Sequence, residues 1–365
     1  MDAALAQFRE RITAAASGGA PLRLHGAGTK DFYGESLTGD ALDTRMFAGI
    51  VDYEPSELVM TARCGTPLSA IEGELARNGQ FLPWEPPSFG GDPTIGGVVA
   101  SGLSGPRRAS AGAARDFVLG ASLLIASGEL LNFGGQVMKN VAGFDVSRLL
   151  CGSLGILGLI TQISFKVLPL PRAEMTLRIE CDARAAVDSC NRWRALPLPI
   201  SATAWRAGIL SVRLSGAENA LRTARVTIGG EALDEATAQA GWRSVRDQKS
   251  AFFQEQSRGR LWRLSVPAAA PLEFNGVMPR GASSASDELL IEWSGALRWL
   301  RSDAPADAVR NVAEKLGGTA TLWRGMRDTT MFHPLAPGNL ELHRRLKREF
   351  DPHSIFNRNR LINGL

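Results

Sequence analysis

Three clusters of small residues could do chemistry in this chain through their backbone amide groups. The first is the turn LHGAGTKD at 24–31, which follows the short apolar run at 21–24. The second is DPTIGGVVASGLSG at 92–105, and the third is GSLGILGLIT at 152–161. Glycine lets the backbone approach a ligand closely, and consecutive N–H groups can bind an anion. The clusters therefore raise the question of a phosphate-bearing ligand.

The turn at 24–31 matches neither of two well-known nucleotide-binding patterns. In a dinucleotide fingerprint that starts at Gly26 and Gly28, Asp31 takes the third glycine position, where helix and strand must pack closely. In a Walker phosphate loop, Thr29 and Lys30 should be followed by Ser or Thr, and here Asp31 follows. Both mismatches argue against nicotinamide and ATP chemistry. By itself the turn is either an anion-binding nest or a plain loop.

The second and third clusters strengthen the ligand interpretation. Small residues in the apolar context of 92–105 would let a flat or charged ligand lie on the backbone. In the third cluster, Gly152, Gly155 and Gly158 recur at a spacing of three, which would also suit a close contact between two helices.

Composition excludes several classes of protein. The 365 residues are 44% hydrophobic and 21% charged, with a net charge of +4 and two tyrosines, so nucleic-acid binding is not indicated. The four cysteines form no CxxC pair, which argues for thiols in a reducing cytosol and against an iron–sulfur site. The N-terminal segment 1–19 mixes acids with arginines, unlike a signal peptide. The apolar stretch at 149–160 is too short to span a bilayer.

The hydrophobic pattern predicts an α+β chain with a change of texture near residue 172. A helix over 2–16 precedes a small β-β-α unit over 21–79. A second unit over 80–172 contains a hairpin turning at 127–129 and ends at Pro169 and Pro171. Beyond it, hairpin-joined strands alternate with helices, which predicts an antiparallel α+β domain. A charged helix is expected near the C-terminus.

The three clusters resemble the motifs of PCMH-type (vanillyl-alcohol oxidase-like) FAD-binding domains over roughly residues 10 to 172. HGAGTK is similar to the pyrophosphate loop of that family, TIGGVVASGLSG to the segment along pyrophosphate and flavin, and GSLGILGLIT to the element near the adenine. Within the family, GPRR, RDFVLG and KNVAGFD together resemble the E subunits of bacterial glycolate oxidases (glycolate dehydrogenases). The tail FDPHSIFNRNRL resembles the family's returning segment.

The resemblance implies a domain organisation and a set of FAD-binding residues. It divides the chain into an FAD-binding domain at 1–172 with subdomains at about 1–79 and 80–172, a cap at 173–325 and a returning segment at 326–365. The implied diphosphate donors are Gly26, Ala27, Gly28, Thr29 and Lys30. The implied residues along the ribityl chain and pyrophosphate are Thr94, Gly96, Gly97, Ser101, Gly102 and Gly105. The others are Val141, Ala142 and Gly143 on the adenosine or ribityl side, Ile160 at the adenine and Asn357 near the isoalloxazine.

The chain departs from the family pattern at three points. Lys30 stands where relatives more often have glycine, and no histidine is placed for covalent attachment of the flavin. The HxGDGNxH metal signature of the larger D-2-hydroxyacid dehydrogenases is missing, and the four histidines are scattered, so we predict no metal site. For the carboxylate of an anionic substrate, the candidates are Arg324, Arg327 and His333 in the segment that leaves the cap.

The resemblance implies an FAD-binding subunit of a complex that oxidises glycolate to glyoxylate by hydride transfer to flavin. Its partners would be a homologous larger flavin subunit and an iron–sulfur subunit that takes the electrons. The implied location is the cytoplasm, with the inner membrane reached only through the complex. Two alternatives stay open: a non-catalytic electron-relay or assembly subunit beside a catalytic paralogue, and a stand-alone FAD oxidase for another alcohol or a sugar lactone.

Overall fold

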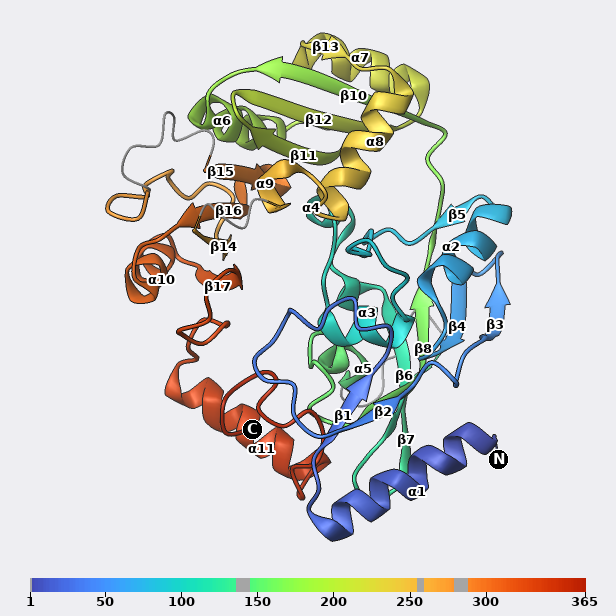
Figure 1. The fold of residues 1–365 in the computed structure, drawn as a ribbon. Helices are drawn as coiled ribbons and strands as arrows, with labels where there is room; N and C mark the ends of the chain where they lie inside the picture. Colours follow the sequence, from blue (N-terminus) through green and yellow to red (C-terminus); the bar gives the residue numbers. More distant parts are fainter. Residues whose placement is uncertain (1, 136–144, 255–258, 279–287) are drawn as a thin grey trace. The chain divides into compact units, whose positions relative to one another are not determined.

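The computed structural model describes residues 2–135, 145–254, 259–278 and 288–365. The chain forms two compact units, each with its own sheet and core (Figure 1). Unit 1 comprises Met1–Ser104, Gly112–Leu170 and Pro334–Leu365, and unit 2 comprises Gly105–Ala111 and Pro171–His333. The predicted α+β class is confirmed. The described residues contain no helix with the length and apolarity needed to cross a membrane.

Unit 1 is built on a five-stranded antiparallel sheet in the order β3-β4-β8-β6-β7. Its strands are β3 (Ile50–Glu54), β4 (Val59–Arg63), β8 (Leu159–Lys166), β6 (Val118–Leu124) and β7 (Leu130–Gly134). The predicted hairpin between β6 and β7 is confirmed, and Gly128 takes the left-handed conformation there with a φ of 80°. Two strand pairs complete the unit: the parallel pair β1 (Leu22–His25) and β2 (Asp40–Asp43), and the antiparallel pair β5 (Gln80–Phe81) and β9 (Leu168–Pro169).

The helices of unit 1 include an N-terminal and a C-terminal element that serve the same core. The helices of this unit are α1 (Ala3–Gly18), α2 (Leu68–Arg77), α3 (Ile95–Ser101), α5 (Val146–Leu150) and α11 (Pro337–Phe350), with a 3-10 turn η1 (Ala114–Asp116). The short helix α4 (Arg108–Ala111) belongs to unit 2. Phe8 and Ile12 of α1 pack against β1 and β2, and Ile355 and Phe356 after α11 join the same cluster. The two ends of the chain therefore meet at β1, where the first glycine cluster begins.

Unit 2 is an eight-stranded sheet in which every strand pair is antiparallel, in the order β13-β10-β12-β11-β15-β16-β14-β17. The strands are β10 (Ala173–Glu180), β11 (Ile200–Arg206), β12 (Ile209–Gly216), β13 (Glu231–Ala232), β14 (Arg260–Ser265), β15 (Leu289–Glu292), β16 (Leu297–Ser302) and β17 (Thr319–Arg324). The helices are α6 (Ala183–Trp193), α7 (Glu218–Ile228), α8 (Glu235–Arg246), α9 (Ala251–Gln254) and α10 (Ala306–Lys315), with the 3-10 turn η2 (Trp293–Gly295).

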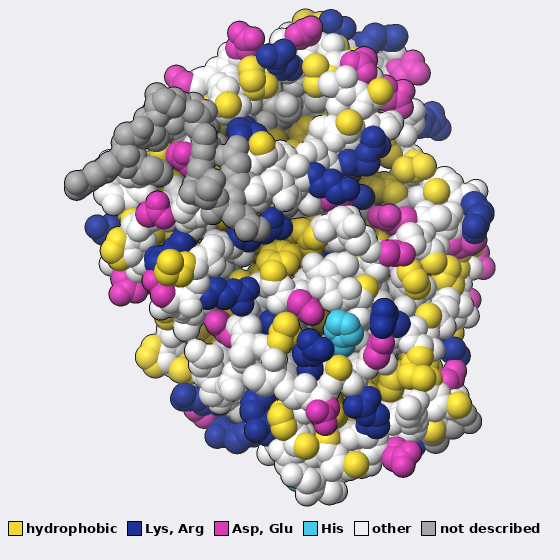
Figure 2. Space-filling view, viewed as in Figure 1, with side chains coloured by type: hydrophobic (Ala, Val, Ile, Leu, Met, Phe, Trp, Pro, Cys, Tyr) yellow, Lys and Arg dark blue, Asp and Glu magenta, His cyan; other side chains and the backbone are white. Residues whose placement is uncertain are grey.

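The core of unit 2 lies between its sheet and the helices α6, α7 and α10. Apolar residues of these helices and alternate residues of the strands form one buried cluster, which includes Val309 and Leu300. Trp299, one position before Leu300, packs edge-on against Phe253 of α9 and Trp323 of β17, with ring centroids 5.2 and 5.1 Å away. On the face of the molecule in Figure 2, acidic and basic side chains are interspersed, as the small net charge predicts.

Candidate functional site

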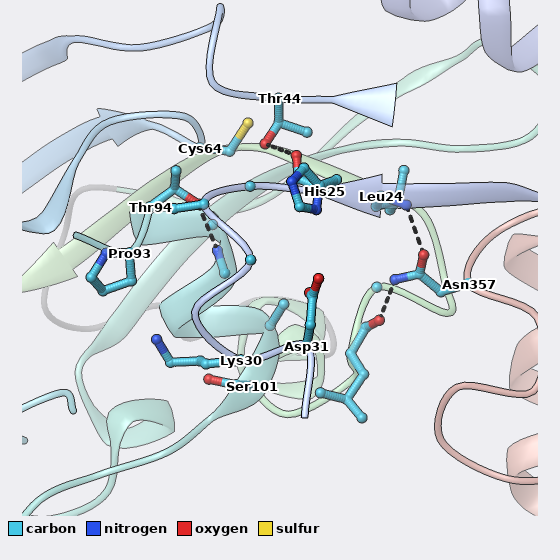
Figure 3. A pocket seen from close by; sticks show the side chains of 18 of the residues that line it. Leu24, His25, Lys30, Asp31, Thr44, Cys64, Pro93, Thr94, Ser101 and Asn357 are labelled. Atoms are coloured by element: carbon cyan, nitrogen blue, oxygen red, sulfur yellow. Dashed lines mark hydrogen bonds between the residues drawn. The ribbon is translucent and has the colours of Figure 1, made fainter. Parts of the chain in front are cut away.

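A pocket in unit 1 is lined by all three small-residue clusters (Figure 3). Its space is about 820 Å³ when the part open to solvent is included. The predicted residues that line it are Gly26, Ala27, Gly28, Thr29, Lys30, Thr94, Gly96, Gly97, Ser101, Ile160 and Asn357. Val141, Ala142 and Gly143 lie outside the described residues, and Gly102 and Gly105 are not in the pocket wall.

The first wall of the pocket is the turn that leaves β1. Its entry is held by the carbonyl of His25, which accepts the N–H and the hydroxyl of Thr44 at 2.8 and 3.0 Å. A Cβ at Gly26 would collide with the hydroxyl of Thr94, so residue 26 has no room for a side chain while Thr94 keeps this position. Gly28 has a φ of 70°, which favours glycine as well. The backbone of 26–28 therefore lies directly at the pocket surface.

The second wall is α3 together with the residue before it. The hydroxyl of Thr94 caps this helix by accepting the N–H of Gly97 at 3.3 Å (Figure 3). A Cβ at Gly96 would lie 2.8 Å from the Cβ and 2.9 Å from the carbonyl oxygen of Cys64. Gly96 is thus required because α3 starts in backbone contact with the end of β4.

Thr94→Ala removes the hydroxyl that caps α3. We expect the free energy of unfolding to fall by about 1 kcal/mol, because the N–H of Gly97 loses its acceptor. Urea unfolding of the purified chain measures the loss. Thr94→Ser keeps the hydroxyl and should recover most of it, and an unchanged Thr94→Ala variant would contradict the capping role.

The third wall is a turn that runs into β8, so the alternative of a helix–helix contact at Gly152, Gly155 and Gly158 is wrong. The N–H of Gly152 donates to the carbonyl of Val99 at 3.0 Å. A Cβ at Gly102 would lie 3.0 Å from the Cα of Gly152. Gly102 therefore serves the contact between this turn and the end of α3.

Asn357 joins the first and third walls. Its amide oxygen accepts the N–H of Leu24 at 2.7 Å, and its amide nitrogen donates to the carbonyl of Leu154 at 2.6 Å (Figure 3). Its own N–H donates to the carbonyl of Leu22 at 2.9 Å. A Cβ at Gly155 would lie 2.8 Å from the amide nitrogen, so Gly155 leaves room for this side chain. Asn357 therefore lines the pocket and also links its first and third walls through side-chain hydrogen bonds.

The remaining predicted residues lie in unit 2, where their polar groups have local partners. The carbonyl of Gly105 accepts the indole N–H of Trp293 at 3.0 Å. Arg324 donates to the carbonyl of Phe253 and to the side chain of Gln248, at 3.2 and 3.3 Å. Burial lowers the pKa of Arg324, and the nearby charge of Arg301 lowers it further.

His333 is half-buried and bonded at both ring nitrogens, and Arg327 is exposed. Nδ1 of His333 accepts the N–H of Ala320 at 3.3 Å, so Nε2 carries the proton and faces the carboxylate of Glu314 at 3.0 Å. Of the three predicted anion-binding side chains, Arg327 is the one on the surface of unit 2.

A buried ion pair behind the pocket was missed by sequence reasoning. Lys347 of α11 and Asp351 are 2% and 0% exposed, and Nζ lies 2.6 Å from the carboxylate. Nζ also donates to the carbonyls of Ile156 and Phe356 at 2.6 and 2.9 Å. Burial lowers the pKa of Lys347, and the carboxylate of Asp351 partly offsets this. The spacing of four residues in a helix was the available signal, but a surface ion pair has the same spacing.

The residues of the pocket fit the FAD that the motifs imply. The positions at Gly26 and Gly96, where a Cβ would collide with neighbouring atoms, bring backbone rather than side chains to the wall. Lys30 and Arg360 place positive charge in the wall, as a diphosphate requires. Leu154, with Leu159 and Ile160, gives an apolar wall suited to a flat ring system.

Two comparisons show the family. Residues 4–134 match the family model described as FAD binding domain. Over 352 residues the chain is 43% identical to glycolate oxidase subunit GlcE of Escherichia coli (strain K12), covering 96% of this chain and 95% of that subunit. The chain belongs to the GlcE family of PCMH-type FAD-binding proteins. Its cofactor is FAD, and it is a flavoprotein of the oxidoreductase class.

More distant relatives extend the likeness to other flavoproteins. Glycolate oxidase subunit GlcD of Bacillus subtilis (strain 168) is 33% identical over 128 residues, or 35% of this chain and 27% of that protein. A D-lactate dehydrogenase of Archaeoglobus fulgidus is 28% identical over 235 residues, or 60% of this chain and 51% of that protein. The structure of an alkyldihydroxyacetonephosphate synthase has the same fold, with a TM-score of 0.68 at 14% identity over 97% of this chain and 75% of that one.

Proposed function

We propose that this chain is the FAD-binding subunit of a complex that oxidises glycolate to glyoxylate. The observation that carries the proposal is the identity to GlcE along 96% of the chain. The pocket supports it, because its first two walls lie within residues 4–134, which match the FAD binding domain model.

Each wall of the pocket has a separate task in this proposal. FAD, when bound, supplies the acceptor for the hydride that leaves the α-carbon of the 2-hydroxy acid. The backbone N–H groups of 26–30 and the charge of Lys30 bind the diphosphate. The bare backbone at Gly96 and Gly97 lets the ribityl chain lie against α3, and Ile160 excludes water beside the adenine.

The electrons leave through an iron–sulfur partner in this proposal. Burial raises the pKa of Cys64 and of Cys151 to about 12 and that of Cys190 to about 11. The pKa of Cys181 is raised too. Iron–sulfur clusters are bound by sets of cysteine thiolates, and the four cysteines of this sequence form no CxxC pair. A larger flavin subunit, to which the likeness with GlcD points, completes the proposed complex.

Arg327 is the proposed ligand of the substrate carboxylate. In the assembled complex, Arg327→Met should raise the KM for glycolate about 10- to 100-fold, since one charge-assisted hydrogen bond is lost. Glycolate-dependent reduction of an artificial electron acceptor measures KM and kcat. Arg225→Met, at an exposed position of α7, is the control and should change neither value. Equal kinetics for the Arg327 variant and the wild type would remove Arg327 from the site.

A second candidate function is favoured by the bonds of His333 and Arg324. Because both side chains are held by neighbours within unit 2, they are less available to a substrate. The chain would then bind FAD as an electron relay or an assembly subunit beside a catalytic paralogue. Under this alternative the Arg327 variant leaves the KM for glycolate unchanged. If the chain is a relay, loss of its FAD still stops electron flow.

A further inference from the structure

Arg360 lies in the C-terminal tail and donates hydrogen bonds to several carbonyl groups of the loop that contains and follows the first glycine cluster. Its Nη2 lies 3.3, 2.8 and 2.6 Å from the carbonyl oxygens of Lys30, Asp31 and Tyr33. Its Nη1 donates to the carbonyl of Glu35 at 3.0 Å. The contact is reciprocal in the backbone, since the N–H of Glu35 donates to the carbonyl of Arg360 at 2.8 Å.

The loop is shaped around this guanidinium group. Arg360 is 6% exposed and lines the pocket. Gly34 has a φ of 118°, and a Cβ there would lie 2.7 Å from Nε of Arg360. A planar guanidinium with five N–H donors can serve several carbonyls at once, which the ammonium of lysine cannot do in the same geometry.

Holding these carbonyls has a consequence for the residues that face the ligand. The peptide unit is planar, so each carbonyl that Arg360 holds sets the direction of the next N–H along the chain. The peptide after Lys30 carries the N–H of Asp31, which donates to the carbonyl of Gly28 at 3.0 Å. By holding this peptide, Arg360 supports the turn that contains residues 28–30 before any ligand arrives. A loop that is ordered in advance loses less entropy when it binds.

We propose that Arg360 is a positioning residue of the FAD site, which orders the 26–35 loop for the diphosphate. The proposal rests on the assignment of residues 26–30 to the diphosphate, and it adds a second residue of the C-terminal tail, beside Asn357, to the cofactor site. Arg360 acts through the backbone of the loop. The planar shape of its guanidinium group is needed as well as the positive charge, because one group must bind several carbonyls of the loop.

The test compares Arg360→Met and Arg360→Lys with Arg358→Met in the full-length chain after removal of flavin. Arg358 lies on the same tail and donates to the carbonyl of Ser354 at 2.8 Å, but it is not part of the pocket wall. We expect the Kd for FAD, measured by quenching of flavin fluorescence, to rise about 10- to 100-fold in Arg360→Met. Arg360→Lys should show an intermediate Kd, and Arg358→Met should stay within about twofold of the wild type.

A second readout separates loop order from general stability. Trypsin cleaves after lysine, and the peptide that ends at Lys30 is quantified by mass spectrometry. We expect faster cleavage at Lys30 in Arg360→Met than in Arg358→Met, without FAD. Equal FAD affinity in Arg360→Met and Arg358→Met overturns the inference, whether or not cleavage at Lys30 changes. None of these outcomes depends on glycolate, so a failure here is distinct from a failure of the proposed function.

Discussion

Gly96→Val is expected to abolish FAD binding at concentrations that saturate the wild type, with an increase in Kd of at least about 100-fold. The new side chain would meet both the Cβ and the carbonyl oxygen of Cys64 within 3 Å, and backbone cannot move aside as a flexible side chain can. The start of α3 must therefore shift, and it carries Gly97, Ala100 and Ser101 of the pocket wall with it. Fluorescence titration with FAD measures the effect.

The same substitution at Gly73 is the matched control. Gly73 lies in α2, and a Cβ there meets nothing within 4 Å. Gly73→Val should bind FAD like the wild type and change the free energy of unfolding by less than about 1 kcal/mol. If Gly96→Val retained the affinity of Gly73→Val, the close contact between α3 and β4 would not be needed for the cofactor.

Removal of either partner of the buried pair Lys347 and Asp351 is expected to lower the free energy of unfolding by about 3–5 kcal/mol. Lys347→Met leaves the carboxylate of Asp351 fully buried with the N–H groups of Ile355 and Phe356, at 3.1 and 2.8 Å. Asp351→Asn leaves a buried ammonium group that faces two carbonyls. Urea unfolding followed by circular dichroism measures the loss.

An exposed pair on the same helix is the control for this loss. Arg348 and Glu341 of α11 form an ion pair 3.1 Å long, with side chains 65% and 52% exposed. Arg348→Met should cost no more than about 1 kcal/mol, because water screens the pair. Equal losses for Lys347→Met and Arg348→Met would show that the buried pair does not hold the tail to the third wall of the pocket.

The glycine clusters were predictable from sequence because their function lies in the backbone. A position that needs bare backbone is visible in the sequence as a glycine. The structure brings residues 26–30, 94–101 and 154–160 to one pocket. Gly102 shows the limit of this reasoning: it belongs to the second cluster, but its Cα faces Gly152 instead of the pocket. The choice between a ligand and a neighbouring turn depends on contacts that are distant in sequence.

Arg360 and Lys347 could not be predicted, because their partners lie far away along the chain. Arg360 contacts residues more than 320 positions earlier, and Lys347 contacts Ile156 across 191 positions. In the sequence both belong to a charged tail that looks solvated. Burial turns them into internal ligands of backbone carbonyls, and only the fold reveals burial.

If this subunit is the one that oxidises glycolate in the proposed complex, glycolate should reduce the FAD that this chain binds. The most direct experiment is the anaerobic addition of glycolate to the purified chain loaded with FAD. The measured quantity is the absorbance of the flavin at about 450 nm. We expect glycolate to bleach this band and oxygen then to restore it. A bound flavin that stays oxidised in the presence of glycolate would contradict catalysis by this chain and would support the relay alternative.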